Sequence, residues 1–177
     1  MTPRPRSEEL VRRAVAQAPR GGVVADVGTG SGAIAVAIAA ARPDLTIWAT
    51  DTSPRAVRLA RRNAALHGIA HRVAVREGDL LAPVTDRVDV VVANLPYLAE
   101  EERPFRPDLA CEPAEAVFLA GDPLGLARRL LREAPAWLEP DGLAILQLPE
   151  GVLEVGAAEA RRAAMQLSTP VSFELAA

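Results

Sequence analysis

The sequence predicts an open, mostly parallel α/β sheet with helices on both faces. Short apolar runs alternate with longer amphipathic stretches from Gly21 to about Met165, and this alternation is typical of such sheets. Most of the runs are short and apolar, as expected of strands that are covered on both faces. With 177 residues, 50% of them hydrophobic, the chain is the size of one domain and can bury a substantial core. We therefore expect a single domain over residues 1–177.

The strands and helices follow from the apolar runs and the stretches between them. The expected strands are Val23–Val27, Leu45–Thr50, Val73–Arg76, Val88–Ala93, Leu143–Leu148 and Val171–Leu175. The expected helices lie near Gly32–Arg42, Pro54–His67, Pro123–Trp137 and Val152–Met165. Ser53 before Pro54 is a strong helix start, because an N-cap hydroxyl precedes a proline at the first helical position.

Two further stretches are not assigned to a particular helix or strand. The pair Arg12-Arg13 falls in a helix-like stretch and is interpreted as a solvated helix face. Residues Leu98–Asp122 are rich in Pro and Glu and too long for an ordinary connection. Long irregular loops in compact domains are usually functional, so we expect a functional role for this segment.

Composition excludes several classes of protein. Cys111 is the only cysteine and cannot form an internal disulfide, and no charged start leads into an apolar run, so a cytoplasmic protein is expected. No stretch reaches the ~20 apolar residues that cross a bilayer. A net charge of −3 argues against an electrostatic grip on nucleic acid. His67 and His71 are expected at the surface, and two histidines do not make a metal site.

The first expected strand ends in "ADVGTGSGA", a glycine-rich turn. Its pattern is G-x-G-x-G, with Ala33 where a dinucleotide fingerprint has its last glycine. Such a turn lets a ligand approach the backbone closely, and the following helix offers free amides; a purely structural tight turn is the alternative. The candidate binding residues here are Asp26, Gly28, Thr29, Gly30, Ser31 and Gly32.

Acidic residues follow the next two strands at the same end of the predicted sheet. Asp51 closes the second strand, where a carboxylate can accept hydrogen bonds from both hydroxyls of a ribose. Asp79, followed by Leu80, comes after the third strand, where it can accept from an adenine amino group. Each acid alone has an ordinary reading, as a residue before a helix cap or in a turn. Ligands of parallel sheets bind at the carboxyl ends of the strands, so the acids and glycines together favour a nucleoside site.

With these features the sequence resembles the class I S-adenosylmethionine-dependent methyltransferases. "NLPY" after the fourth strand is similar to the (N/D)-P-P-Y signature of members that methylate planar amide or exocyclic nitrogens. The resemblance implies that the Asn94 side-chain oxygen and the Leu95 carbonyl accept the two hydrogens of the acceptor nitrogen. Pro96 would stiffen the loop and Tyr97 would pack against the flat group. It also implies S-adenosylmethionine as cofactor, with Asn94 beside it, and a Rossmann-like fold.

Two further segments resemble one branch, the glutamine side-chain amide methyltransferases of peptide release factors (the HemK/PrmC family). Thr2–Val11 is similar to its P-R-P-x-[ST]-E segment, and "EPAEAVFLAGDPLGL" to its E-P-x-x-A-L-x-G-G-x-D-G-L segment. The likeness covers about residues 2–148. Glu112-Pro113 and Gly121 would shape a substrate groove or serve the structure only.

Some features depart from that branch. Leu95 replaces its first proline, and "NLPY" is also the signature of ribosomal RNA adenine dimethyltransferases. The helical domain that precedes the catalytic domain in bacterial members is missing, so an activator subunit or a homo-oligomer would stand in for it. Only Val171–Leu175 is found where the fold normally ends in a hairpin, so we expect an abbreviated C-terminus.

Three functions are therefore compared. The leading one is an N-methyltransferase acting on a protein glutamine, with a peptide chain release factor as partner and no membrane. The second is an RNA or DNA adenine N6-methyltransferase, which would stack a flipped base on Tyr97; the acids of "LAEEERPF" near Asn94 argue against it. The third is a catalytically inactive cofactor-binding subunit, against which the intact Asn94–Tyr97 signature argues.

Overall fold

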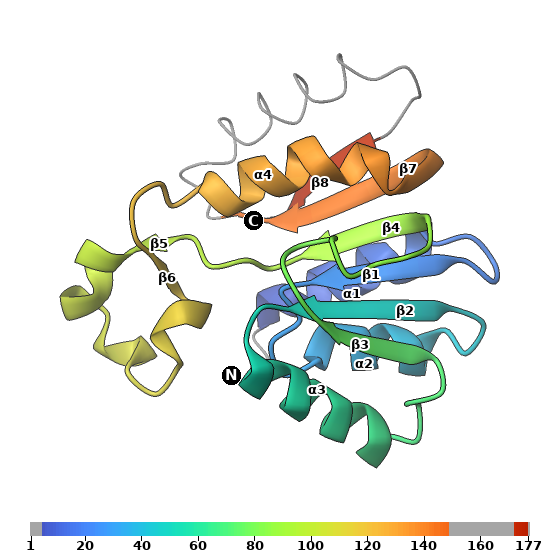
Figure 1. Ribbon diagram of the computed structural model, residues 1–177, viewed down its shortest axis with the longest axis horizontal. Coiled ribbons are helices and arrows are strands. Elements are labelled where there is room, and N and C mark those ends of the chain that lie inside the picture. The colour runs from blue at the N-terminus through green and yellow to red at the C-terminus, as the bar shows by residue number, and fades with distance from the viewer. Residues whose placement is uncertain (1–4, 149–171, 177) are drawn as a thin grey trace.

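A six-stranded parallel sheet forms the centre of the molecule in the computed structural model, which describes residues 5–148 and 172–176. The strand order is β3-β2-β1-β4-β7-β8, and every pairing is parallel (Figure 1). The strands are β1 (Val23–Val27), β2 (Thr46–Asp51), β3 (Val73–Glu77), β4 (Val88–Ala93), β7 (Leu138–Gln147) and β8 (Ser172–Ala176). The expected parallel α/β sheet is confirmed, and its strand bounds differ from the expected ones mostly by one residue.

Helices cover both faces of the sheet, as expected. Three of them pack on one face: α1 (Pro5–Gln17), α2 (Ala33–Ala41) and α3 (Pro54–Leu66). On the other face lies α4 (Gly125–Glu133), which continues into the short 3-10 helix η4 (Ala134–Ala136). The Ser53 hydroxyl accepts from the Ala56 amide, with Pro54 at the first position of α3, so the predicted helix start is confirmed.

The apolar strands supply both halves of the core because successive side chains point to opposite faces. In β1, Val24 joins the cluster under α1–α3, while Ala25 joins the cluster under α4. In β2, Ile47 and Trp48 divide in the same way. A strand buried on both faces is mostly apolar, which is why these runs show no regular polar alternation. Asp26 of β1 and Thr50 of β2 are buried polar exceptions.

Two elements differ from the sequence expectation. The sequence indicates only helix-like character around Arg12-Arg13, whereas α1 runs over 13 residues and buries Leu10 and Ala14, followed by the buried Ala18 just after its end. Strand β7 begins at Leu138, five residues before the expected strand, and carries Asp141 with a φ of 65°. A register shift between Val88 and Val90 accompanies the early start. The expected helix Val152–Met165 lies outside the described residues.

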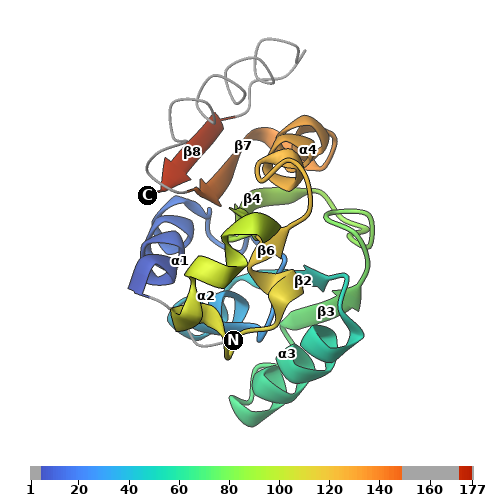
Figure 2. The ribbon, with the colours of Figure 1, turned by 90° about the vertical axis from the view of Figure 1, so that its left-hand side faces the viewer.

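The segment predicted as an irregular loop has a small structure of its own at the carboxyl end of the sheet, by which we mean the side where the parallel strands end (Figures 1 and 2). It contains β5 (Leu98–Ala99) paired with β6 (Phe118–Leu119), and the 3-10 helices η1 (Glu100–Phe105), η2 (Pro107–Leu109) and η3 (Ala114–Ala116). Leu109, Val117 and Phe118 form its separate core. We call residues 98–122 the insert.

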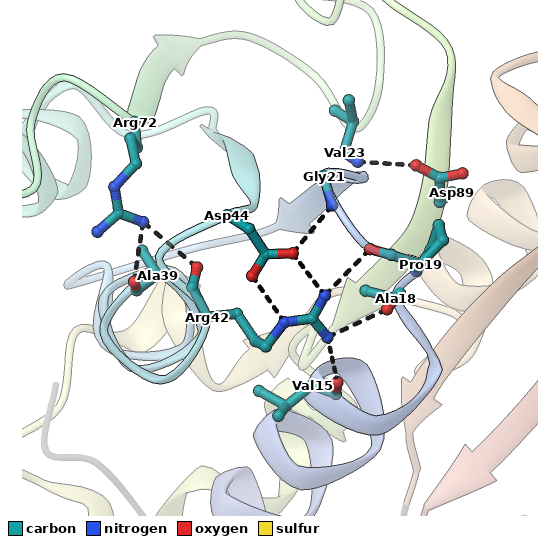
Figure 3. A network of polar contacts seen from close by, with 10 residues as sticks. All are labelled: Val15, Ala18, Pro19, Gly21, Val23, Ala39, Arg42, Asp44, Arg72 and Asp89. Carbon is teal, nitrogen blue, oxygen red and sulfur yellow. Dashed lines mark hydrogen bonds and ion pairs between the residues drawn. The ribbon is translucent and has the colours of Figure 1, made fainter.

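At the opposite, amino end of the sheet, Arg42 holds the end of α1 (Figure 3). Its guanidinium donates to the carbonyl oxygens of Val15 (2.8 Å), Ala18 (3.1 Å) and Pro19 (3.1 Å). Asp44 pairs with the same guanidinium at 2.8 Å and accepts from the Gly21 amide. The last carbonyls of a helix have no partner inside the helix, so Arg42 supplies the hydrogen bonds that α1 lacks.

None of the helices in the described part of the chain has the length and apolar character needed to cross a bilayer.

Candidate active site

A cavity of about 570 Å³ opens at the carboxyl end of the sheet. This volume lies within the range of about 300–1,000 Å³ typical of small-molecule sites. Its walls come from the turn after β1, the ends of β2, β3 and β4, the insert and α4. Residues from each of these parts line it, among them Gly28, Gly30, Ser31, Asp51, Asp79, Leu80, Asn94, Glu112 and Leu126.

The glycine-rich turn is fixed to the end of β2. The amides of Gly28 and Thr29 both donate to the Thr50 carbonyl oxygen at 2.9 Å. Gly28 has a φ of 71°, and a Cβ there would lie 2.7 Å from a methyl group of Leu95. A side chain at this position is therefore excluded by the backbone and by Leu95 together. The turn stays open to the cavity because nothing protrudes from it.

Asp51 joins the turn to the start of α3. Its Oδ2 accepts from the Gly30 amide at 2.8 Å, and its Oδ1 accepts from the Ser53 amide at 2.9 Å. An ionised carboxylate has about four acceptor positions, so two remain for a ligand in the cavity. The side chain is half-buried and lines the cavity.

Asp79 and Leu80 form the next wall. The Thr50 hydroxyl, fully buried, donates to the Leu80 carbonyl oxygen at 2.8 Å. Leu80 is buried and has a φ of 43°, a strained value for a leucine that this hydrogen bond helps to hold. Asp79 is exposed and forms an ion pair with Arg129 of α4. The pair links the end of β3 to α4 across 50 residues of sequence.

Asp26 lies beneath the turn and lines neither of the cavities at this end of the sheet. Its Oδ2 accepts from the Thr29 hydroxyl at 2.6 Å and from the Ala35 amide at 3.1 Å, while its Oδ1 is buried without a partner. Burial raises the pKa of Asp26 to about 6, although the hydrogen bond from Thr29 opposes the rise. Its contacts hold the turn against the first helical turn of α2.

The Asn94–Tyr97 segment lines a second, smaller cavity of about 80 Å³ beside the first. Gly28, Ser31 and Asn94 line both cavities, so the two adjoin at the end of β4. The Asn94 amide nitrogen donates to the Ser7 hydroxyl of α1 at 3.3 Å. Tyr97 lines the smaller cavity together with Arg106 and Val117 of the insert.

Most of the predicted site residues therefore meet at one place. Gly28, Gly30, Ser31, Asp51, Asp79, Leu80 and the Asn94–Pro96 stretch line the larger cavity, and Thr29 and Tyr97 the smaller one. Gly32 lines neither; its φ is 79°, and a Cβ there would lie 3.0 Å from the Ala60 side chain of α3. Glu112 and Pro113 line the larger cavity, whereas Gly121 does not.

The remaining candidates have ordinary positions. His67 and His71 are exposed, as expected. Cys111 is exposed and lies in the wall of the larger cavity. Within residues 5–148 and 172–176, no group of three or more His, Cys, Asp or Glu side chains could hold a metal ion.

Three residues with contacts at the site had no role predicted from the sequence: Ser7, Thr50 and Arg129. Thr50 is the one with a visible signal, because a hydroxyl between apolar residues and Asp51 at the end of a strand needs a buried partner. Ser7 occupies the [ST] position of the P-R-P-x-[ST]-E segment, so that resemblance marks the residue without revealing its partner 87 positions away. Arg129 reaches a residue 50 positions away, and no local pattern reveals that contact.

Comparison with known proteins connects this geometry to a family. Residues 7–107 match the family described as "Methyltransferase small domain". The release factor glutamine methyltransferase of Xylella fastidiosa is 42% identical over 151 residues, which is 83% of this chain and 54% of that protein. The ribosomal protein uL3 glutamine methyltransferase of Bradyrhizobium diazoefficiens is 40% identical over 72% of this chain and 41% of that protein.

Among solved structures, the ribosomal protein L11 methylase of Lactobacillus delbrueckii subsp. bulgaricus aligns with a TM-score of 0.65 at 26% identity. The alignment covers 90% of this chain and 66% of that one. The chain spans about half the length of the curated relatives it matches.

Proposed function

The chain belongs to the methyltransferase small domain family, and on this basis we propose that it transfers a methyl group from S-adenosylmethionine to a planar amide nitrogen. The favoured acceptor is a protein glutamine side chain, such as that of a peptide chain release factor. One observation supports this most: Asn94, Leu95 and Pro96 line both the larger cavity and the smaller one beside it. A nucleoside cofactor and a side-chain amide would thus meet at Asn94.

The larger cavity suits S-adenosylmethionine in size and in chemistry. Gly28 leaves the turn open to a close approach, and Asp51 keeps two acceptor positions on the cavity side that suit ribose hydroxyls. Asp79, with Leu80 beside it, provides a carboxylate for the adenine amino group. Bound there, S-adenosylmethionine supplies a methyl group on a sulfonium, so that a nitrogen–carbon bond forms while the carbon–sulfur bond breaks with its electron pair left on sulfur.

The residues of the chain have to hold and polarise the acceptor nitrogen. The lone pair of an amide nitrogen is delocalised, so the nitrogen needs help as positive charge develops on it. Asn94 Oδ1 and the Leu95 carbonyl oxygen accept its two hydrogens in this proposal, which stabilises that charge. Holding nitrogen, methyl carbon and sulfur in line accounts for several kcal/mol of barrier. The proton leaves to water.

The acidic run at the start of the insert favours a protein acceptor over a nucleic acid. Glu100, Glu101 and Glu102 of η1 begin three residues after Tyr97 and are exposed, although they line neither cavity and Arg106 lines the smaller one. Clustered carboxylates repel a phosphate backbone. The smaller cavity is also far below the volume of a site for a whole small molecule. A translation factor as acceptor places the reaction in the cytoplasm.

A labelling experiment distinguishes the candidate functions. The protein is incubated with S-adenosylmethionine labelled in its methyl group, a candidate release factor, ribosomal proteins and total RNA. Label in a protein that maps to a glutamine side chain supports the proposal. Label in RNA supports the adenine methyltransferase instead, and cofactor binding without any transfer supports the inactive subunit.

A further inference from the structure

Helix α1 contributes a side chain to the candidate active site. Ser7, in its first turn, accepts a hydrogen bond from Asn94 Nδ2 at 3.3 Å and lines the smaller cavity. Both side chains are half-buried. The contact joins the start of the described chain to the end of the central strand β4, 87 residues away.

Helix α1 holds Ser7 in position because its middle is packed in the core and its C-terminal end is bound by Arg42. Leu10 and Ala14 are fully buried, and the helix contacts α2, β4 and β7. Arg42 binds the carbonyl oxygens of Val15 and Ala18 at its C-terminal end. A packed helix held in this way can place a hydroxyl with the precision that a loop does not offer.

The two ends of the Asn94 amide are chemically opposite. Oδ1 can only accept a hydrogen bond and Nδ2 can only donate one. An acceptor amide brings N–H donors, so a productive site must present Oδ1; with the amide turned over, two donors would face each other and remain unpaired. A serine hydroxyl can accept from Nδ2 or donate to Oδ1, and in this structure the Ser7 hydroxyl accepts from Nδ2. This pairing uses the donor end of the amide and leaves Oδ1 for the acceptor nitrogen, which is the productive orientation.

We propose that Ser7 is a positioning residue: by accepting the hydrogen bond from Asn94 Nδ2, it directs Asn94 Oδ1 toward the acceptor nitrogen. The inference rests on the proposed function for its effect on the rate, whereas the contact itself does not depend on it. Ser7 would affect the methyl transfer step through Asn94 and leave cofactor affinity unchanged.

The contact is tested first by NMR of the ¹⁵N-labelled protein without ligands. The Asn94 side-chain NH₂ signals are identified by their loss in Asn94→Asp. In Ser7→Ala one of the two hydrogens should shift upfield and exchange faster with water, and in Ser7→Thr, which keeps the hydroxyl, both should stay near their parent positions. Gln17→Ala, at the exposed far end of α1, is the matched control and should change neither. Unchanged Asn94 signals in Ser7→Ala overturn the inference whether or not the protein methylates anything.

Single-turnover methylation at saturating cofactor tests the consequence. Ser7→Ala and Ser7→Cys, whose thiol is a weak acceptor, should slow transfer by ~3- to 10-fold, the scale of one neutral hydrogen bond. Ser7→Thr should restore the parent rate, and all three should bind S-adenosylmethionine with parent affinity. Equal rates in Ser7→Ala and the parent overturn the inference while leaving the proposed function intact. A parent that binds the cofactor and methylates no acceptor overturns the proposed function, and the NMR result still decides the contact.

Discussion

The aspartates at the two ends of the sheet lie in opposite electrostatic environments. At the amino end, Asp44 pairs with Arg42 and accepts from the Gly21 amide, and these contacts lower the pKa of its carboxyl well below its usual range. At the carboxyl end, Asp26 is buried with one oxygen unpartnered, and burial raises its pKa to about 6. The first arrangement favours the charged aspartate, and the second disfavours it.

The difference follows from what each end has to do. The amino end joins α1, α2 and β2, and its hydrogen bonds are made within the protein (Figure 3). The carboxyl end holds acceptors that point into cavities, such as the free positions of Asp51. Unmet polar groups cost stability and are useful where a ligand will meet them. Changes to the cavity-lining residues of the carboxyl end should therefore affect chemistry, whereas changes to residues buried behind the cavities, such as Asp26, and changes at the amino end should affect stability.

The largest effect is expected at Asn94. Asn94→Ala should fold normally and bind S-adenosylmethionine about as well as the parent, while methyl transfer falls by ~100-fold or more, the scale of one preorganised contact to a developing charge. Single-turnover methylation at saturating cofactor measures it. If Asn94→Ala transfers the methyl group at the parent rate, the Asn94–Tyr97 segment is only a turn. The carboxyl end would then have no catalytic role at this segment.

The buried aspartate should give the cofactor-free protein an unusual pH dependence. Because burial raises the folded pKa of Asp26 above the ordinary value of 3.8, its contribution to stability is fully present below pH 3.8 and is lost as pH rises through about 6. The loss amounts to at most about 3 kcal/mol. The lowered pKa of Asp44 contributes stability that is lost as pH falls below about 4. The pH ranges in which the two aspartates affect stability are therefore separate.

Urea unfolding at several values between pH 4.5 and 7.5 measures this effect. The free energy of unfolding of the parent should fall over that range, and Asp26→Asn should flatten the curve because it does not titrate. If the free energy of unfolding depends on pH in the same way in the parent and in Asp26→Asn, the charged form of Asp26 does not destabilise the folded protein.

A somewhat smaller effect is expected at Asp51. Asp51→Ala removes the carboxylate that we propose binds the ribose and also releases the Gly30 and Ser53 amides. Affinity for S-adenosylmethionine should therefore fall by roughly 10- to 100-fold, on the scale of one hydrogen bond to a charged group. Calorimetry measures it. Glu77→Ala is the matched control, since Glu77 is an exposed carboxylate at the end of the next strand. Equal affinities of Asp51→Ala and Glu77→Ala would take Asp51 out of the cofactor site.

The smallest effect should come from the amino end. Arg42→Met keeps the apolar stem but removes the hydrogen bonds to Val15, Ala18 and Pro19, so the melting temperature should drop by several degrees. Transfer per folded molecule should drop far less than in Asn94→Ala. Arg58→Met, at an exposed position of α3, should leave the melting temperature nearly unchanged. A rate loss in Arg42→Met that matches Asn94→Ala would show that the two ends do not divide stability and chemistry between them.

The sequence by itself determined the parts of this protein that depend on local pattern. Strands buried on both faces are largely apolar, with few polar residues such as Asp26 and Asp89, so the runs ending at Val27, Asp51 and Ala93 are visible without a structure. Parallel strands end on the same side, and the turn glycines, Asp51 and Asn94 could be assigned to one site because each directly follows such a run. The start of α3 was equally visible, since Ser53 and Pro54 act within a single turn.

Only the tertiary structure decided what depends on distant partners. The two-residue strands of the insert form because Leu109, Val117 and Phe118 pack together, and no period is readable in so short an element. Strand β7 begins at Leu138, ahead of Pro140 and Gly142, because β4 offers it a partner. The burial that raises the pKa of Asp26 comes from the elements packed around it. Likewise, Ser7 meets Asn94 only because α1 packs beside β4. Such contacts arise from the packing of whole elements, and the residues near them in the chain carry no trace of it.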